Sequence, residues 1–231
     1  MIKLIPLLLA IGWGLAAYMF SAWRTKQILD AQSVPLKDAE LERLTRRMAA
    51  ALDLTEIKVH LFNIEPVNGL GAPDGRIFLT RGFYDRFRAG VVTAEELASV
   101  IAHELAHVAL GHTRRRMIDF SGQNAVFVSL VVLFLRVIPV VGPLIAMFMA
   151  NMITGALAAR MSRRDEFEAD AWASALLIKS GIGTAPQISL FEKLERLTGS
   201  RMAAAPAWVL SHPKSAERIK AIRSNEARWT A

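Results

Sequence analysis

A long, almost wholly apolar run from Ala125 to Ala159 most constrains how this chain can fold. It exceeds the roughly 20 residues that one straight membrane span needs. Its only charge is Arg136, and helix-breaking residues (Pro139, Gly142 and Pro143) lie near its middle. These features predict an apolar helical hairpin over about residues 120–159, with its turn near 136–143. The hairpin could span a bilayer, dip into one leaflet, or pack on a soluble domain.

A second apolar segment extends from Leu4 to Phe20 without a charge, between Lys3 and the basic residues Arg24 and Lys26. It is long for the core of a signal peptide, and its more basic flank comes after it. We therefore expect a retained membrane anchor over residues 1–24, with a cleaved signal peptide as the alternative. Residues 25–231 would then form one domain that carries the hairpin as an insertion.

The net charge of +7 comes with 53% hydrophobic and 21% charged residues, and the basic residues gather beside the apolar runs. They are Arg24, Lys26, Arg114 to Arg116, Arg160, Arg163 and Arg164. Such flanks suit membrane lipid headgroups, and no nucleic-acid recognition motif accompanies them. The positive-inside rule then predicts an inner-membrane protein with its domain in the cytoplasm, whereas signal-peptide cleavage would leave the domain in the periplasm.

Periodicity predicts a mostly helical α+β domain with a small sheet. Apolar residues at steps of three and four predict a helix over residues 36–57, and alternation with turn residues at Ala72 to Gly75 predicts a sheet with a hairpin. Thr93 and Glu96 form a capping box that begins the next helix.

That helix contains the stretch VIAHELAHVALGH, which carries His103, Glu104 and His107. Residues four apart share a helix face, so both imidazoles can bind one ion, while Glu104 can reach a water at the metal. The chain has no cysteine, so any metal is held by His, Asp or Glu. This donor set favours a single Zn²⁺, with Glu104 as the general base.

A catalytic zinc site usually has three protein ligands, and the segment DEFEAD supplies a third. Glu166 is the candidate ligand. Asp170, one turn later, can accept the N–H of a ligand histidine, which we assign as His103. Asp165 and Glu168 project elsewhere on the helix and are interpreted as solvated charges.

Two other histidines have simpler interpretations. His112 follows Gly111 at the wrong offset for the third histidine of a metzincin, so we interpret it as a residue of the helix C-terminal cap. His60 is expected at the surface or on an edge strand.

Four blocks in order resemble the HtpX-like and CAAX-prenyl-protease-like membrane zinc metallopeptidases, a gluzincin group with a zincin-type domain. The resemblance covers most of the chain beyond residue 35. The blocks are VNGLGAPDGRIFLTRGFYD, TAEELASVIAHELAHVALGH, MSRRDEFEADAWA and SHPKSAERI. The first usually begins Asn-Ala-x-Ala, so Gly69 and Gly71 depart from the pattern.

The resemblance implies that His103, His107 and Glu166 bind zinc and that Glu104 acts as the base. It also implies that a substrate pairs as an added strand with Asn68, Gly69, Leu70, Gly71 and Ala72. His212 would donate to the oxyanion, reach the zinc in a resting state, or simply belong to a His-Pro turn. Arg218 is expected to pair with a carboxylate.

The predicted function is therefore a membrane-associated zinc metalloendopeptidase that hydrolyses protein substrates, with membrane or envelope protein quality control as the role implied by the resemblance. The alternative is a catalytically silent, zinc-binding membrane chaperone or adaptor. The sequence carries no indication of the oligomeric state.

Overall fold

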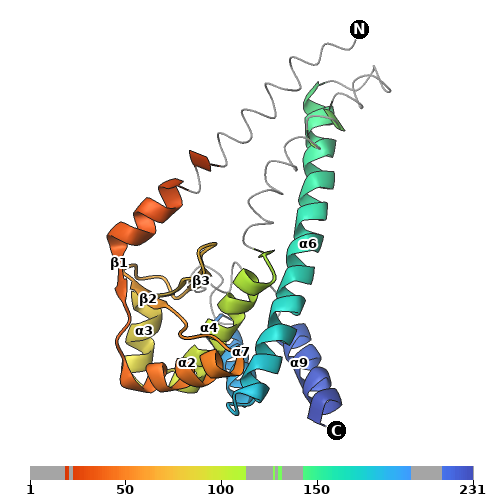
Figure 1. Ribbon diagram of the computed structural model, residues 1–231. Coiled ribbons are helices and arrows are strands. Elements are labelled where there is room, and N and C mark those ends of the chain that lie inside the picture. Colours follow the sequence, from red (N-terminus) through yellow and green to blue (C-terminus); the bar gives the residue numbers. More distant parts are fainter. Residues whose placement is uncertain are drawn as a thin grey trace. The chain divides into compact units, whose positions relative to one another are not determined.

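The computed structural model describes residues 19–20, 23–112, 127, 130–131, 143–198 and 215–230 (Figure 1). The chain divides into two compact units, Met1–Ala31 with Arg114–Ser162, and Gln32–Thr113 with Arg163–Ala231. Helices and one small sheet make up the regular structure of the described residues, so the predicted α+β class is confirmed. Most of the predicted anchor and most of the first half of the predicted hairpin lie outside the described residues.

In the first unit, residues 23–31 are helical, and α6 (Pro143–Lys179) contributes its residues up to Ser162. This part of α6 exposes large apolar side chains, among them Leu144, Phe148 and Met152. No helix within the described ranges is both long and apolar enough to cross a membrane. The predicted membrane helices therefore stay predictions.

The second unit contains a four-stranded sheet in the order β1-β2-β4-β3. The strands are β1 (Ser33–Pro35), β2 (Val59–Phe62), β3 (Gly69–Gly71) and β4 (Ile77–Thr80). β2 and β4 are parallel, and the two outer pairs are antiparallel. Because β1 covers the far side of β2, His60 lies half-buried on an inner strand beside Phe78, and its expected place at the surface or an edge is wrong.

The predicted hairpin is the β3–β4 pair. Its turn is closed by the Gly75 N–H, which donates to the Ala72 carbonyl at 3.0 Å. Gly75 has φ of +89°, a conformation that favours glycine. β3 bonds to β4 on one side only, which makes it an edge strand of this sheet.

The first helix of this unit, α2 (Ala39–Ala51), begins at Asp38, whose side chain accepts from the Glu40 and Leu41 amides. It buries Leu41, Leu44 and Met48, as the periodicity predicts. It is shorter than the predicted range because Asp53 adopts a left-handed φ of +56°. The short helix α3 (Arg81–Arg88), which the sequence did not predict, follows β4 directly.

The helix with the histidines, α4 (Ala94–Ala109), is the centre of the unit. The predicted capping box of Thr93 and Glu96 is confirmed. Nearly every side chain of α4 is buried, because the helix contacts α2, β3, β4 and α7 (Ala185–Thr198), and α9 (Ser215–Thr230) packs on α7. A helix enclosed in this way is a firm support for a site.

Candidate metal centre

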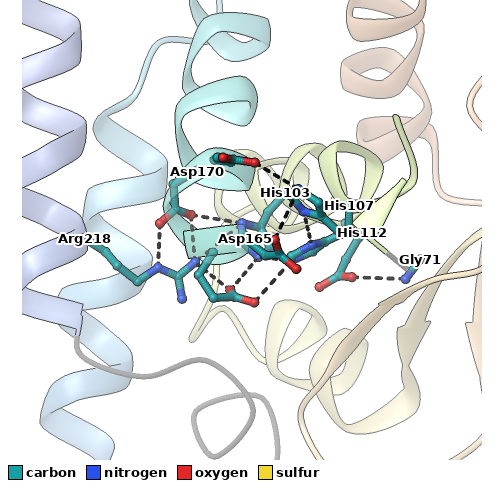
Figure 2. Close-up of polar contacts among 10 residues, drawn as sticks. Gly71, His103, His107, His112, Asp165, Asp170 and Arg218 are labelled. Carbon is teal, nitrogen blue, oxygen red and sulfur yellow. Dashed lines mark hydrogen bonds and ion pairs between the residues drawn. The ribbon is translucent and has the colours of Figure 1, made fainter. Parts of the chain in front are cut away.

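Three buried side chains meet between α4 and the second part of α6 (Figure 2). The Nε2 atoms of His103 and His107 are 3.1 Å apart. Glu166 places Oε2 at 3.3 Å from the first of these nitrogens and Oε1 at 3.5 Å from the second. The structure thus brings together the three predicted ligands, and their donor atoms lie within 4.8 Å of one another.

These distances fit a tetrahedral ion. With metal–ligand bonds of about 2.0–2.1 Å, neighbouring ligand atoms of a tetrahedron lie roughly 3.3 Å apart. The charges also fit a cation. Among the described residues nearby, three buried carboxylates, of Glu104, Glu166 and Asp170, lie near one buried guanidinium, that of Arg218. A divalent cation would balance the excess of negative charge. Two imidazole nitrogens and one carboxylate oxygen are donors that zinc accepts.

Asp170 lies one turn after Glu166 on α6 and contacts His103. Its Oδ1 atom is 3.0 Å from Nδ1 of His103, which leaves Nε2 of that ring directed toward Glu166. Arg218 from α9 donates to both oxygens of Asp170, as predicted for an arginine that pairs with a carboxylate. Burial raises the pKa of Asp170, but Arg218 and His103 outweigh it, so the pKa is lowered.

The same contacts act on the pKa of His103. Burial lowers that pKa, whereas the hydrogen bonds to Asp170 and Glu166 raise it, and the result is a pKa of about 9 in the metal-free site. A proton therefore competes with a metal ion for this ring at neutral pH.

Glu104 is buried beside the ligands on α4. Its Oε2 atom accepts from the Gly71 amide of β3 at 3.1 Å, a contact drawn in Figure 2. The edge strand and the helix therefore touch through the predicted base.

This contact gives a steric reason for the unusual glycines. A β-carbon on Gly71 would lie 2.7 Å from the Glu104 carbonyl oxygen and 2.8 Å from Val108 Cγ2. One on Gly69 would lie 2.8 Å from Val100 Cγ1. β3 packs so closely on α4 that alanine does not fit here without a shift.

The predicted substrate segment forms β3 and its two flanking residues. Both flanking residues form hydrogen bonds on the β4 side. The Asn68 carbonyl accepts from the Thr80 amide, and the Ala72 amide donates to the Arg76 carbonyl. Gly69 and Gly71 are buried, whereas Leu70 between them is exposed. The remaining predicted site residue, His212, lies outside the described residues.

The structure adds His112 to the surroundings of the site. It is fully buried, and its Nδ1 atom is 3.0 Å from Nδ1 of His107. Gly111, with φ of +69°, ends α4 and turns the chain, after which the ring of His112 lies against the helix. The sequence signal was the Gly-His pair just past the helix end, which we interpreted only as part of a cap.

The interpretation of Asp165 as a solvated charge is also wrong. Asp165 is 4% exposed, and its Oδ1 atom lies 3.8 Å from Nε2 of His112. Glu168 is half-buried, with Oε2 at 3.4 Å from the same nitrogen and Oε1 bonded to Arg164. His112, Asp165 and Glu168 form a second group of donor atoms within 4.8 Å.

Two histidines one turn apart on a helix, with a glutamate beside the first and a carboxylate from another helix, define the HExxH class of metallopeptidases. The chain belongs to peptidase family M48, whose profile matches residues 35–226. This match confirms the predicted family.

Curated relatives agree with this family. Metalloprotease LoiP of Escherichia coli K12 is 32% identical over 167 residues, which cover 72% of this chain and 62% of LoiP. Metalloprotease YcaL of the same organism is 28% identical over 191 residues, covering 81% of this chain and 69% of YcaL. Protease HtpX of Legionella pneumophila strain Philadelphia 1 is 25% identical over 257 residues, covering 96% and 88%. The chain thus spans less than two thirds of the length of LoiP.

Proposed function

We propose that this chain is a membrane-associated zinc metalloendopeptidase that holds one Zn²⁺ through His103, His107 and Glu166. The observation that carries the proposal is the convergence of these three buried donor atoms at tetrahedral spacing, with Glu104 beside them. Protein substrates are the class that the names of the relatives support, since LoiP and YcaL are called metalloproteases.

A bound Zn²⁺ would polarise the scissile carbonyl and acidify a water molecule at the site. Glu104 takes the proton from the attacking water and passes it to the leaving amine. The hydrogen bond from the Gly71 amide holds the carboxylate of Glu104 at the edge of β3. Nδ1–H of His103 donates to the carboxylate of Asp170, which fixes the orientation of the ring.

The substrate binds as an extended strand along β3. The hydrogen-bond pattern between β3 and β4 supports this. Asn68 and Ala72 form their main-chain hydrogen bonds toward β4, and successive residues of a strand direct their main-chain groups to opposite sides. Gly69 and Gly71 therefore direct theirs away from β4, on the side where Glu104 meets Gly71. A substrate paired on that side would have its peptide backbone beside the base.

Membrane association is supported by the uncharged segment Leu4 to Phe20, by the apolar run to Ala159 and by the basic residues that flank both. We infer a cytoplasmic peptidase unit at the inner membrane that acts on membrane or envelope proteins, with a periplasmic unit as the alternative after cleavage of a signal peptide. A reporter fused to the C-terminus distinguishes the two, because reporter activity is confined to one side of the membrane.

The silent chaperone or adaptor is not favoured, because the chain keeps a buried carboxylate at position 104 and orders it against β3. A protein that only binds zinc has no use for this carboxylate. The decisive comparison is the full-length protein in detergent or lipid, with casein as the substrate and zinc content measured on the same samples.

We expect the parent to bind one zinc and degrade casein, and Glu104→Gln to keep the zinc but lose at least about a hundredfold in rate. Glu95→Gln, on the first turn of the same helix, is the matched control and should match the parent. Unchanged hydrolysis by Glu104→Gln would refute the base assignment, and a zinc-loaded parent without hydrolysis would support the chaperone. Full zinc retention by Glu166→Ala would refute that ligand.

A further inference from the structure

The two ligand histidines of the proposed site have different partners on their far side. Nδ1 of His103 faces the carboxylate of Asp170 at 3.0 Å. Nδ1 of His107 faces another imidazole nitrogen, Nδ1 of His112, at the same separation of 3.0 Å. The ring of His112 is fully buried, and its Nε2 atom faces Glu168 and Asp165 (Figure 2).

The hydrogens on this chain of nitrogens can be counted. A contact of 3.0 Å between two ring nitrogens holds a single hydrogen. If Nε2 of a neutral His107 is a metal ligand, its one hydrogen is on Nδ1 and donates to His112. His112 then accepts through Nδ1, and its own hydrogen is on Nε2, directed at the two carboxylates.

The same count bears on the second group of donor atoms. A cation bound by Nε2 of a neutral His112 would require that ring's hydrogen on Nδ1. Two hydrogens would then oppose each other across the 3.0 Å contact with His107. The group of His112, Asp165 and Glu168 therefore suits a support for the first site better than a second ion.

We propose that His112 is a positioning residue that fixes the tautomer and the ring orientation of the zinc ligand His107, in a relay from His107 through His112 to Glu168 and Asp165. This inference rests on the proposed zinc site. Gly111 makes the relay possible, because its left-handed φ of +69° ends the helical path just before His112, whose ring then contacts that of His107. Glu168 is in turn held by Arg164, one turn earlier on α6, at 2.8 Å.

The test compares two variants of nearly equal size in the full-length, metal-free protein. The carboxamide of His112→Asn places an oxygen near the former Nδ1 position, where it can accept from His107, whereas His112→Leu offers no acceptor. Zinc affinity is measured by competition with a chelator, and the visible spectrum of the Co²⁺-loaded protein reports the ligand geometry. Thermal unfolding of the metal-free variants shows whether the fold survives.

We expect His112→Leu to weaken zinc binding by about 10- to 100-fold and to alter the cobalt spectrum, as loss of a partner behind a ligand does. His112→Asn should stay within about tenfold of the parent and keep the spectrum. If His112→Leu does not fold, His112→Gln replaces it. The longer glutamine side chain carries its carboxamide past His107 toward the carboxylates, so the same loss of zinc affinity is expected.

Glu42→Gln is the matched control, because Glu42 pairs with Arg46 four residues later, as Arg164 and Glu168 do, but belongs to neither group of metal-donor atoms. It should bind zinc like the parent, while Glu168→Gln should bind more weakly. Equal zinc affinity and equal cobalt spectra for the parent and the variant without an acceptor would overturn the positioning role. An equal loss of zinc affinity in His112→Asn and His112→Leu, with both metal-free proteins folded, would also overturn it. A parent without stoichiometric zinc would instead refute the proposed function itself.

Discussion

Arg218 donates to both carboxylate oxygens of Asp170, from Nε at 2.5 Å and from Nη2 at 2.7 Å, and both side chains are buried. The pair links α9 to α6, and it holds the aspartate that contacts His103. Arg218 also lies over the ring of Phe191 on α7, at 4.4 Å from the centroid. One guanidinium therefore joins three helices behind the proposed metal site.

We predict that Arg218→Met destabilises the protein by about 3–5 kcal/mol, because it leaves the buried charge of Asp170 without its partner. Arg223→Met on the same helix is the control. Its guanidinium forms an exposed pair with Glu192, so the loss should be below about 1 kcal/mol. Denaturant unfolding of both variants measures the difference, and equal stabilities would contradict the structural role of the buried pair.

The stability of the metal-free protein should fall as the pH rises from 6.5 to 9. His103 has a pKa of about 9 in the folded state, above its ordinary 6.5. A raised pKa stabilises the fold fully below pH 6.5, and this contribution disappears as the pH passes 9. Its size is on the order of 3 kcal/mol, from about 1.4 kcal/mol per pKa unit.

This pH dependence is checked by urea unfolding in the presence of a chelator. His103→Asn should lack the decline over this pH range, which makes it the matched comparison. Zinc affinity of the parent should rise over the same interval, because protons compete less for the ring. A metal-free parent that is as stable at pH 9 as at pH 6.5 would contradict the prediction.

Gly71→Ala should reduce hydrolysis strongly while Gly69→Ala has a smaller effect. The β-carbon at position 71 would meet the main chain of α4, 2.7 Å from the Glu104 carbonyl oxygen. The backbone of an enclosed helix cannot move aside, so β3 must shift, and the bond from its amide to Glu104 is lost. At position 69 the nearest atom belongs to the Val100 side chain, which can move.

We expect the alanine at position 71 to destabilise the fold by about 1–3 kcal/mol, as overpacking does. Steady-state kinetics and denaturant unfolding of both variants test whether the effect is larger at position 71 than at position 69. A Gly71→Ala enzyme with unchanged kcat/KM would show that β3 has more room above α4 than these contacts allow.

Thr93→Ala should destabilise the protein by about 1 kcal/mol without changing zinc affinity. The hydroxyl of Thr93 accepts from the Glu96 amide at 3.2 Å, and its loss leaves an N–H at the start of α4 without that partner. Thr55→Ala, at an exposed bend, is the control and should be neutral. Thermal unfolding and zinc titration measure the two effects, and a change in zinc affinity would contradict the separation of cap and site.

Local geometry explains what could be predicted from the sequence. The spacing of His103 and His107 and of Glu166 and Asp170 depends only on the helical repeat, and the structure brings all four together. The capping box and the β3–β4 hairpin are likewise local patterns, and both were confirmed. That Glu166 meets the two histidines could be expected only because a metal would need a third ligand.

Contacts between distant segments could not be predicted. β1 pairs with β2 through main-chain atoms, which leaves no side-chain signal, and so His60 was misplaced. The burial of Asp165 depends on His112, whose own position depends on a single left-handed glycine. Helical periodicity stops at Ala109, and nothing in it indicates that the ring of His112 contacts the ring of His107.

The ion pair between Arg218 and Asp170 also has a consequence for folding during synthesis. The ribosome adds residues 103 to 170 well before residue 218. A nascent chain therefore contains the three proposed ligands before it contains Arg218, the partner of Asp170. Burying that aspartate without its arginine is unfavourable. The buried charge of Asp170 therefore has its Arg218 partner only when α9 has been synthesised and has packed against the rest of the unit.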